Sequence, residues 1–84
     1  MKRNKETALS DLPLGSLARI TKMPENNELR FALIRLGIAE NTIICRAFKG
    51  PFGDPDAYFF RGTLVSVRNK DAQTIQVIPY GGTV

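Results

Sequence analysis

The sequence predicts a mainly β domain, a small barrel of about five short strands with one α-helix after the first strand. Three observations predict it. Short apolar runs recur along the chain, separated by turns rich in Gly, Pro, Asn and Asp. Only the stretch 28–36 has apolar residues at helical spacing. In a chain of 84 residues, short strands close most economically into a barrel, because closure removes exposed sheet edges.

Length and charge describe one small domain with short ends. A domain of 84 residues has no room for a large internal ligand cavity. The net charge is +4, but Lys2, Arg3 and Lys5 all lie in the first seven residues. We therefore expect residues 1–7 to be a disordered basic tail, 8–79 the domain, and 80–84 a loose C-terminus. No apolar run reaches the ~20 residues of a membrane span and no signal peptide is visible, so a cytoplasmic protein is expected.

The first part of the domain combines a turn, a strand and the helix. The leucines of 9–15 are expected to cap the core before a strand at 16–23. Asn26 and Asn27 are the candidate N-cap residues, and Gly37 is the candidate left-handed residue after the helix. The predicted core-facing stripe of the helix consists of Leu29, Ala32, Leu33 and Leu36.

Phe31 and Ile34 form a second apolar pair on the helix, beside that stripe. Two interpretations remain open. The pair belongs to the core, covered by the N-terminal leucines, or it forms an exposed apolar patch that marks a partner site.

The remaining strands are predicted at 42–49, 58–60, 64–67 and 74–78, with a polar turn or single helical turn at 68–72. Asn41 is expected to adopt a positive φ in the turn before the first of them. Tyr58 and Phe60 alternate with Phe59, and we expect them to pack in the core. The alternative, an aromatic surface for single-stranded nucleic acid beside Arg61, is disfavoured because one face of the strand must fill the core.

The stretch 50–56 concentrates turn chemistry between apolar runs. It contains two Pro, two Gly and two Asp residues, which predicts an ordered, exposed hairpin loop. Asp54 precedes Pro55, so its backbone is biased to an extended conformation and its carboxylate is free to bond back across the loop. The favoured interpretation is that Asp54 holds the turn together. The alternative is that the loop presents a rigid surface to a partner.

Catalytic and metal chemistry is expected to be absent. The sequence contains no histidine, no phosphate-binding loop, and a single cysteine, Cys45, which we expect to be a buried, inert thiol. Asp54 and Asp56 are two apart and share a face on an extended strand, but two carboxylates are too few for a cation site. We therefore predict no enzymatic activity, no cofactor and no metal site.

Four segments together resemble the FeoA family of bacterial ferrous-iron-transport accessory proteins. They are Leu33-Ile34-Arg35-Leu36-Gly37-Ile38, Pro51-Phe52-Gly53-Asp54-Pro55, Arg61-Gly62, and Val67-Arg68 with Asp71-Ala72 and Ile75-Gln76-Val77. The chain departs from the family pattern in three places: Ala32 replaces a common basic residue, Glu40-Asn41 replaces the usual Pro-Gly turn, and Asp56 replaces an apolar residue.

The resemblance implies an SH3-like barrel with an inserted helix. It also implies a regulatory accessory protein that is cytoplasmic and peripheral to the inner membrane, where it docks on the FeoB-type GTPase permease. Weak self-association is left open. Neither nucleic-acid binding nor insertion into the membrane is expected. The expected partner-binding residues are Phe31, Leu33, Ile34, Pro51, Gly53, Asp54 and Pro55.

Three alternatives stay open. The first is a stand-alone relative of the C-terminal SH3-like module of metal-dependent repressors. The second is a small RNA-binding barrel, which the nearly balanced charge of the body disfavours. The third, an iron-binding chaperone, is disfavoured by the missing histidine and the single cysteine.

Overall fold

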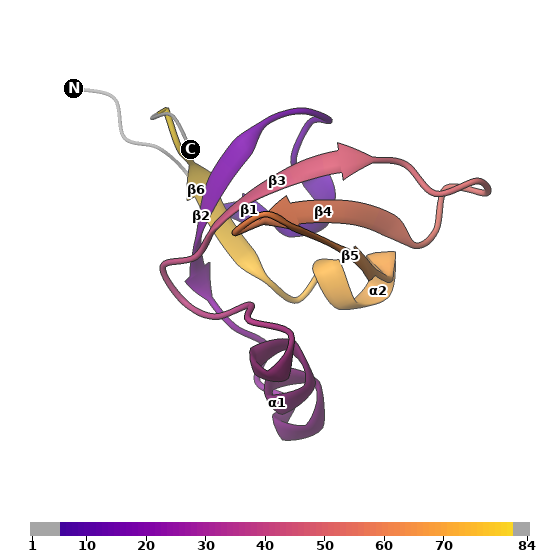
Figure 1. Ribbon diagram of the computed structural model, residues 1–84. Coiled ribbons are helices and arrows are strands. Elements are labelled where there is room, and N and C mark those ends of the chain that lie inside the picture. The colour runs from indigo at the N-terminus through magenta and orange to yellow at the C-terminus, as the bar shows by residue number, and fades with distance from the viewer. Residues whose placement is uncertain (1–5, 82–84) are drawn as a thin grey trace.

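Six antiparallel strands form one strongly curved sheet in the computed structural model, which describes residues 6–81 (Figure 1). Their order across the sheet is β1-β6-β2-β3-β4-β5. The strands are β1 (Thr7–Ala8), β2 (Leu17–Lys22), β3 (Ile43–Phe48), β4 (Asp56–Phe60), β5 (Thr63–Val67) and β6 (Gln76–Pro79). The helices are the 3₁₀ helix η1 (Leu9–Asp11), α1 (Asn27–Arg35) and the single turn α2 (Asn69–Ala72).

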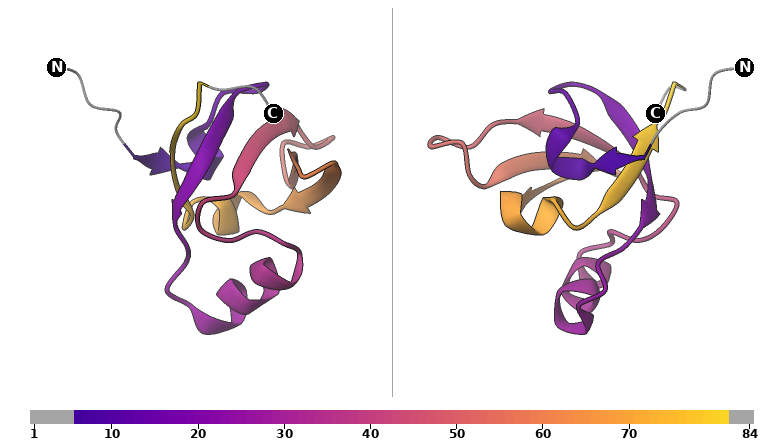
Figure 2. Two further views of the ribbon diagram at one scale, coloured as in Figure 1. Left: turned by 60° about the vertical axis from the view of Figure 1, so that its left-hand side comes forward. Right: turned by 180° about the vertical axis from the view of Figure 1, so that it is seen from behind.

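The predicted mainly β, SH3-like class with one inserted helix is confirmed. The strands lie within a few residues of the predicted ranges, and α1 follows the first long strand. The sheet is open, however: its outer strands β1 and β5 are not paired with each other. The physical reason lies at the start of the chain, where β1 is only two residues long before η1 begins. η1 instead contacts α2, at the side of the sheet seen from behind in Figure 2.

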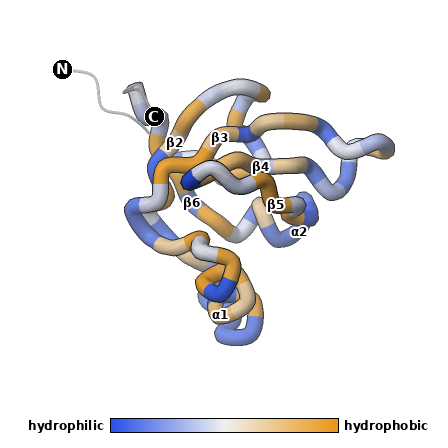
Figure 3. Tube along the Cα trace, in the orientation of Figure 1, coloured by the Kyte–Doolittle hydropathy of each residue, from blue (hydrophilic) through white to orange (hydrophobic). Residues whose placement is uncertain are grey.

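Strand alternation builds the core from one face of the sheet. Ala18 of β2 pairs with Ile44 of β3, and Ile20 pairs with Val77 of β6, and all four are buried. Hydrophobic stretches follow these strands in Figure 3. The other buried hydrophobic residues are Leu9, Leu12, Met23, Leu33, Ile38, Tyr58, Phe60, Val67, Ala72 and Ile75. The predicted core position of Tyr58 and Phe60 is confirmed, whereas Leu14 of the predicted leucine cap is exposed.

Both ends of α1 are capped as the sequence predicts. Asn26 is the N-cap, and its Oδ1 accepts a hydrogen bond of 2.9 Å from the backbone N–H of Leu29. At the other end Gly37 has φ +98°, and the N–H of Ile38 donates to the carbonyl of Leu33 at 2.9 Å. This is a Schellman ending, and Leu33 and Ile38 are both buried beside it.

The predicted apolar stripe of α1 enters the core only in part. Leu33 is buried and Leu29 packs partly against the core, but Leu36 is about half exposed. Leu36 is the C-cap residue, so it lies where the nine-residue helix ends below the sheet (Figure 1). The core therefore holds the helix mainly through Leu33.

The positive φ predicted for Asn41 is confirmed, and the turn between β4 and β5 uses the same left-handed region. Asn41 has φ +73°, so its backbone lies in the left-handed region. Arg61 and Gly62, with φ +49° and +76°, form the two-residue turn between β4 and β5. Positive φ at both residues matches the right-handed twist of the strands that the turn joins.

The chain ends differ from the prediction where they are described. Thr7, assigned to the tail, belongs to β1 and pairs with Val77. The N–H of Tyr80, assigned to the loose C-terminus, donates to the carbonyl of Leu17 at 3.0 Å. The rest of the predicted tail, residues 1–5, and residues 82–84 lie outside the described residues.

We expect Asn26→Ala to destabilise the fold by about 1 kcal/mol, because the N–H of Leu29 loses its acceptor at the start of α1. Urea denaturation followed by circular dichroism measures the change. Asn26→Ser is the matched control, because its side chain still caps the helix, and it should retain most of the stability. Equal losses in the two variants would contradict this role of the N-cap.

Candidate functional site

A buried ion pair lies at the root of the loop between β3 and β4. The carboxylate of Asp56 has no solvent-accessible surface, and the side chain of Arg46 is mostly buried. Arg46 Nη2 lies 2.5 Å from Asp56 Oδ2, and Arg46 Nε donates to the same oxygen at 3.2 Å. The pair joins the inner faces of β3 and β4 where the two strands lead into the loop.

Further hydrogen bonds extend this pair to three parts of the fold. Arg46 Nη1 donates to the carbonyl of Leu12 at 2.8 Å, which ties the segment after η1 to the sheet. Asp56 Oδ1 accepts from the backbone N–H of Gly50 at 3.0 Å, which fixes the start of the loop. Both carboxylate oxygens thus have partners, as a buried charge requires.

The surroundings of Asp56 shift its pKa in opposite directions. Burial raises the pKa of the carboxyl, but the hydrogen bonds from Arg46 and Gly50 and the positive charge of Arg46 outweigh burial. The net result is a pKa below the ordinary value of 3.8, so Asp56 is ionised at neutral pH. The buried hydroxyl of neighbouring Tyr58 has no hydrogen-bond partner among residues 6–81, and burial raises its pKa.

The loop itself is tightly built and exposed, as predicted. A Cβ atom on Gly50 would lie 2.0 Å from the carbonyl oxygen of Pro55, so only glycine fits there. Asp54 Oδ1 accepts a hydrogen bond of 2.9 Å from the N–H of Asn69, and Asn69 Nδ2 donates to the carbonyl of Gly53 at 2.8 Å. Asp54 therefore holds the loop against the start of α2, and does not bond back across the loop. Phe52 at the tip is 96% exposed.

The predicted partner-binding residues fall into three environments. Phe31 and Ile34 are 53% and 47% exposed, so they form an apolar surface patch, called the helix patch below. Leu33 is 4% exposed and belongs to the core, so its side chain is not on the surface. The loop residues Pro51, Gly53 and Asp54 are exposed, and Pro55 is partly buried.

The structure does not bring the helix patch and the loop together. In all three views α1 lies below the sheet, whereas the β3–β4 loop projects from its side (Figures 1 and 2). On α1, Phe31 and Ile34 point away from Leu33 because they lie 160° and 100° from it around a helix of about 3.6 residues per turn. The guanidinium of Arg30 lies over the ring of Phe31, 5.6 Å from its centroid.

Two sequence expectations about single side chains need correction. Asp54 and Asp56 do not share a face: Asp54 reaches out to α2, and Asp56 turns inward to Arg46. Residues 6–81 contain no group of three or more acidic, Cys or His side chains that could hold a metal ion. Cys45 is half-buried and not buried, because it lies on the outer face of β3 beside Phe59.

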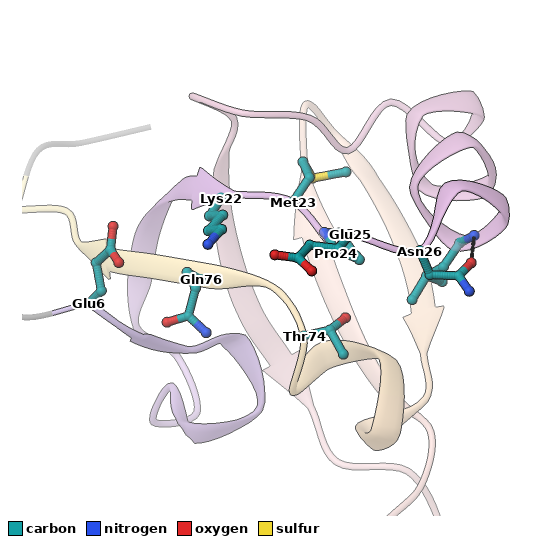
Figure 4. Close-up of a pocket in the computed structure, with 9 residues that line it drawn as sticks. Glu6, Lys22, Met23, Pro24, Glu25, Asn26, Thr74 and Gln76 are labelled. Atoms are coloured by element: carbon teal, nitrogen blue, oxygen red, sulfur yellow. Dashed lines mark hydrogen bonds between the residues drawn. The ribbon is translucent and has the colours of Figure 1, made fainter.

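A cavity of about 490 Å³ lies between the end of β2, the start of α1 and β6 (Figure 4). Its charged lining residues are Glu6, Lys22 and Glu25, and none of the predicted site residues lines it. Within the described part of the chain, no helix is long and apolar enough to span a bilayer.

Sequence reasoning missed the ion pair, although a signal for it was present. Arg46 is two residues from buried Ile44, and Asp56 is two residues from buried Tyr58. In strands, residues two apart share a face, so both charges had to face the core. Two opposite charges at inward positions of neighbouring strands predict a buried pair.

A protein-family model described as the FeoA domain matches residues 7–79. No protein of curated function matches the sequence. Several solved structures do match this chain. An FeoA-like protein of Clostridium acetobutylicum has a TM-score of 0.81 at 25% identity, covering 100% of this chain and 95% of its own. The FeoA protein of Chlorobium tepidum has a TM-score of 0.83 at 27% identity, covering 93% of this chain and 74% of its own.

Two further solved structures share this fold, one described as an SH3-domain protein and one as a transcriptional repressor. The FeoA protein of Stenotrophomonas maltophilia, solved with zinc and described as an SH3-domain protein, has a TM-score of 0.72 at 25% identity, covering 84% and 88% of the two chains. A manganese-dependent transcriptional repressor has a TM-score of 0.82 at 12% identity, covering 95% of this chain and 45% of its own. At that identity, the likeness shows a shared fold.

We expect Arg46→Met to destabilise the fold by about 3–5 kcal/mol, because it leaves the carboxylate of Asp56 buried without a cation. The double variant Arg46→Met/Asp56→Leu should recover a large part of that loss, since the buried charge is then gone. Denaturation of the wild type, both single variants and the double variant measures the coupling. Purely additive losses would contradict a coupled ion pair.

The lowered pKa of Asp56 makes stability depend on pH with a definite sign. The ionised carboxyl stabilises the folded state above its unfolded-state pKa, and this contribution is lost as the pH falls through the lower folded-state pKa. The free energy of unfolding should therefore decrease as the pH is lowered from about 5 toward about 2. The Arg46→Met/Asp56→Leu variant should show a smaller decrease, and an identical decrease would rule out Asp56 as the cause.

Proposed function

This chain belongs to the FeoA domain family, and from that premise we propose that it is an accessory protein of bacterial ferrous iron transport. It acts by docking, from the cytoplasmic side, on a membrane GTPase permease of the FeoB type and regulating it. Family membership supports the link to ferrous iron transport. The exposed surface of this chain supports the docking step.

The observation that carries the proposal is the helix patch. Phe31 and Ile34 expose about half of their surface on the side of α1 that faces away from the core. Two large apolar side chains held on a short, doubly capped helix are a preformed contact for a partner surface. Arg30 is held against Phe31 and also donates to the carbonyl of Pro24 at 3.1 Å, so it adds a fixed positive charge at the edge of the patch.

The β3–β4 loop is a second contact in the proposal, through Pro51, Gly53, Asp54 and Pro55. Its hydrogen bonds to Asn69 and the steric fit at Gly50 restrict its conformations before any partner binds. A rigid loop loses little conformational entropy on docking, which favours affinity. Because the loop and the helix patch lie apart, a single partner must contact two separate regions of this protein.

The role is one of contact and not of catalysis. The sequence has no histidine, and its charged pair at the sheet, Arg46 and Asp56, is buried and neutralised. Among solved neighbours, the Stenotrophomonas maltophilia protein is described as a candidate activating factor of bacterial ferrous iron transport. We propose the same kind of role for this chain.

The repressor-like alternative is supported only at the level of fold. The manganese-dependent repressor shares the architecture at 12% identity, and this chain covers 45% of its length. The family match over residues 7–79 favours the iron-transport role. For the RNA alternative, the aromatic residues Tyr58 and Phe60 are buried in the core and do not offer a stacking surface.

We expect Phe31→Ala and Ile34→Ala each to weaken binding to the permease by about ten-fold, because truncating an exposed apolar contact removes about 1–2 kcal/mol of binding free energy. Both variants should keep wild-type stability, since neither side chain is in the core. The measurement is affinity for purified full-length permease in its GDP-bound and GTP-analogue-bound states.

Leu36→Ala is the matched control, because Leu36 has similar exposure but lies on the core side of α1. It should leave the affinity unchanged. Loss of stability without loss of affinity in the Phe31 and Ile34 variants would show that the helix patch is not the contact. No binding of the wild-type protein in either nucleotide state would contradict the docking proposal itself.

A further inference from the structure

β5 is an outer strand of the sheet with one open edge. It pairs with β4 on one side, and no other strand of the described residues pairs with it. Thr63, Leu64 and Ser66 are exposed, and Leu64 retains 52% of its surface. An unpaired strand edge is a template for another strand, because its N–H and C=O groups stand in a row without partners.

The register shows which backbone groups face the open edge. Phe60 and Thr63 flank the two-residue turn, so they are a hydrogen-bonded pair, and hydrogen-bonded pairs recur at every second position. Val65 and Val67 therefore bond to β4. The N–H and C=O groups of Leu64 and Ser66 point the other way, toward the open edge.

This edge lacks the features that usually protect an outer strand. The five residues of β5 are Thr-Leu-Val-Ser-Val, with no charge and no proline. Natural edges are commonly blocked by lysine, proline or a bulge. On the outer face of the sheet, Leu17, Cys45, Phe59 and Leu64 are directly paired across four strands, so an apolar row ends at the open edge.

The positive charges beside the open edge indicate which kind of segment can bind there. Arg61 precedes β5 and Arg68 follows it, and both are exposed and form no ion pair with any residue in 6–81. A second copy of this chain pairing antiparallel about Val65 would place Arg68 opposite Gly62, beside Arg61. Two such clusters of like charge disfavour self-pairing.

We propose that the open edge of β5 binds an extended segment of a partner protein, apolar at its centre and acidic at both ends, as an added antiparallel strand. Pairing through Leu64 and Ser66 supplies four backbone hydrogen bonds. The residue opposite Leu64 continues the apolar row, and the acidic residues lie near Arg68 and Arg61. This surface is distinct from the helix patch and the β3–β4 loop, and its test requires no iron-transport protein.

The test uses the whole protein labelled with ¹⁵N and a synthetic peptide, Glu-Thr-Thr-Thr-Val-Thr-Thr-Glu, whose valine falls opposite Leu64 when the first Glu lies opposite Arg68. Amide hydrogen exchange is followed by NMR with and without saturating peptide. The amides of Leu64 and Ser66 should exchange at least about ten-fold more slowly in the complex. Those of Val65 and Val67 should change little, because they already bond to β4.

Two peptide controls separate charge from strand pairing. Replacing both terminal Glu residues by Lys should abolish the protection, because the ends then repel Arg61 and Arg68. Replacing the central Val by Pro removes the N–H that pairs with Leu64 and should also abolish it. Equal protection by the Glu and Lys peptides would overturn the proposed acidic partner.

Two variants of the protein test the same edge. Ser66→Pro removes an N–H that points away from β4, so the fold should persist while binding is lost. Arg61→Glu/Arg68→Glu should reverse the preference between the two charged peptides and keeps the test valid if the proline variant does not fold. If the amides of Leu64 and Ser66 are already protected from exchange in the free protein, the edge is occupied. If the free protein forms a concentration-dependent dimer, the edge pairs with a second copy. Either result overturns the proposal.

Discussion

The ion pair between Arg46 and Asp56 is the interaction on which the arrangement of this small domain depends. It crosses β3 and β4, reaches the segment after η1 through the carbonyl of Leu12, and holds the start of the loop through the N–H of Gly50. A domain of this size buries few large side chains, so each fixed contact contributes a large share of its stability. Because the charges are matched and every carboxylate oxygen has a donor, the pair fixes the geometry without leaving an isolated buried charge.

That internal connection leaves the outer surface free for contacts. The core takes one face of the sheet and only Leu33 fully from α1, which leaves Phe31 and Ile34 on the opposite side of the helix. The loop is held by Asn69 of α2 and projects elsewhere, and the open edge of β5 lies beyond β4. Exposed regions of different chemistry are thus presented by separate elements of one scaffold, an arrangement that suits the proposed docking role.

Local patterns predicted most elements because they depend on neighbours in the sequence. Asn26, Gly37 and Asn41 each adopt the conformation that their chemistry favours, and alternation placed Tyr58 and Phe60 in the core correctly. The errors have a different origin. Leu36 lies on the apolar stripe but is the C-cap residue, and its side chain stays about half exposed. Cys45 lies on the outer face of β3, opposite the face that carries buried Ile44, and is only half-buried.

The sequence by itself determined the fold class, the family resemblance, the capped helix and the constrained loop, because these follow from residue spacing and backbone preference over a few residues. Only the tertiary structure decided which apolar side chains of α1 are buried, that Asp56 pairs with Arg46, that Asp54 binds α2, and that the sheet stays open at β5. These outcomes depend on segments far apart in the chain. Alternation sets the face on which a side chain such as Arg46 or Asp56 lies, whereas the packing of the whole domain decides which side chains meet.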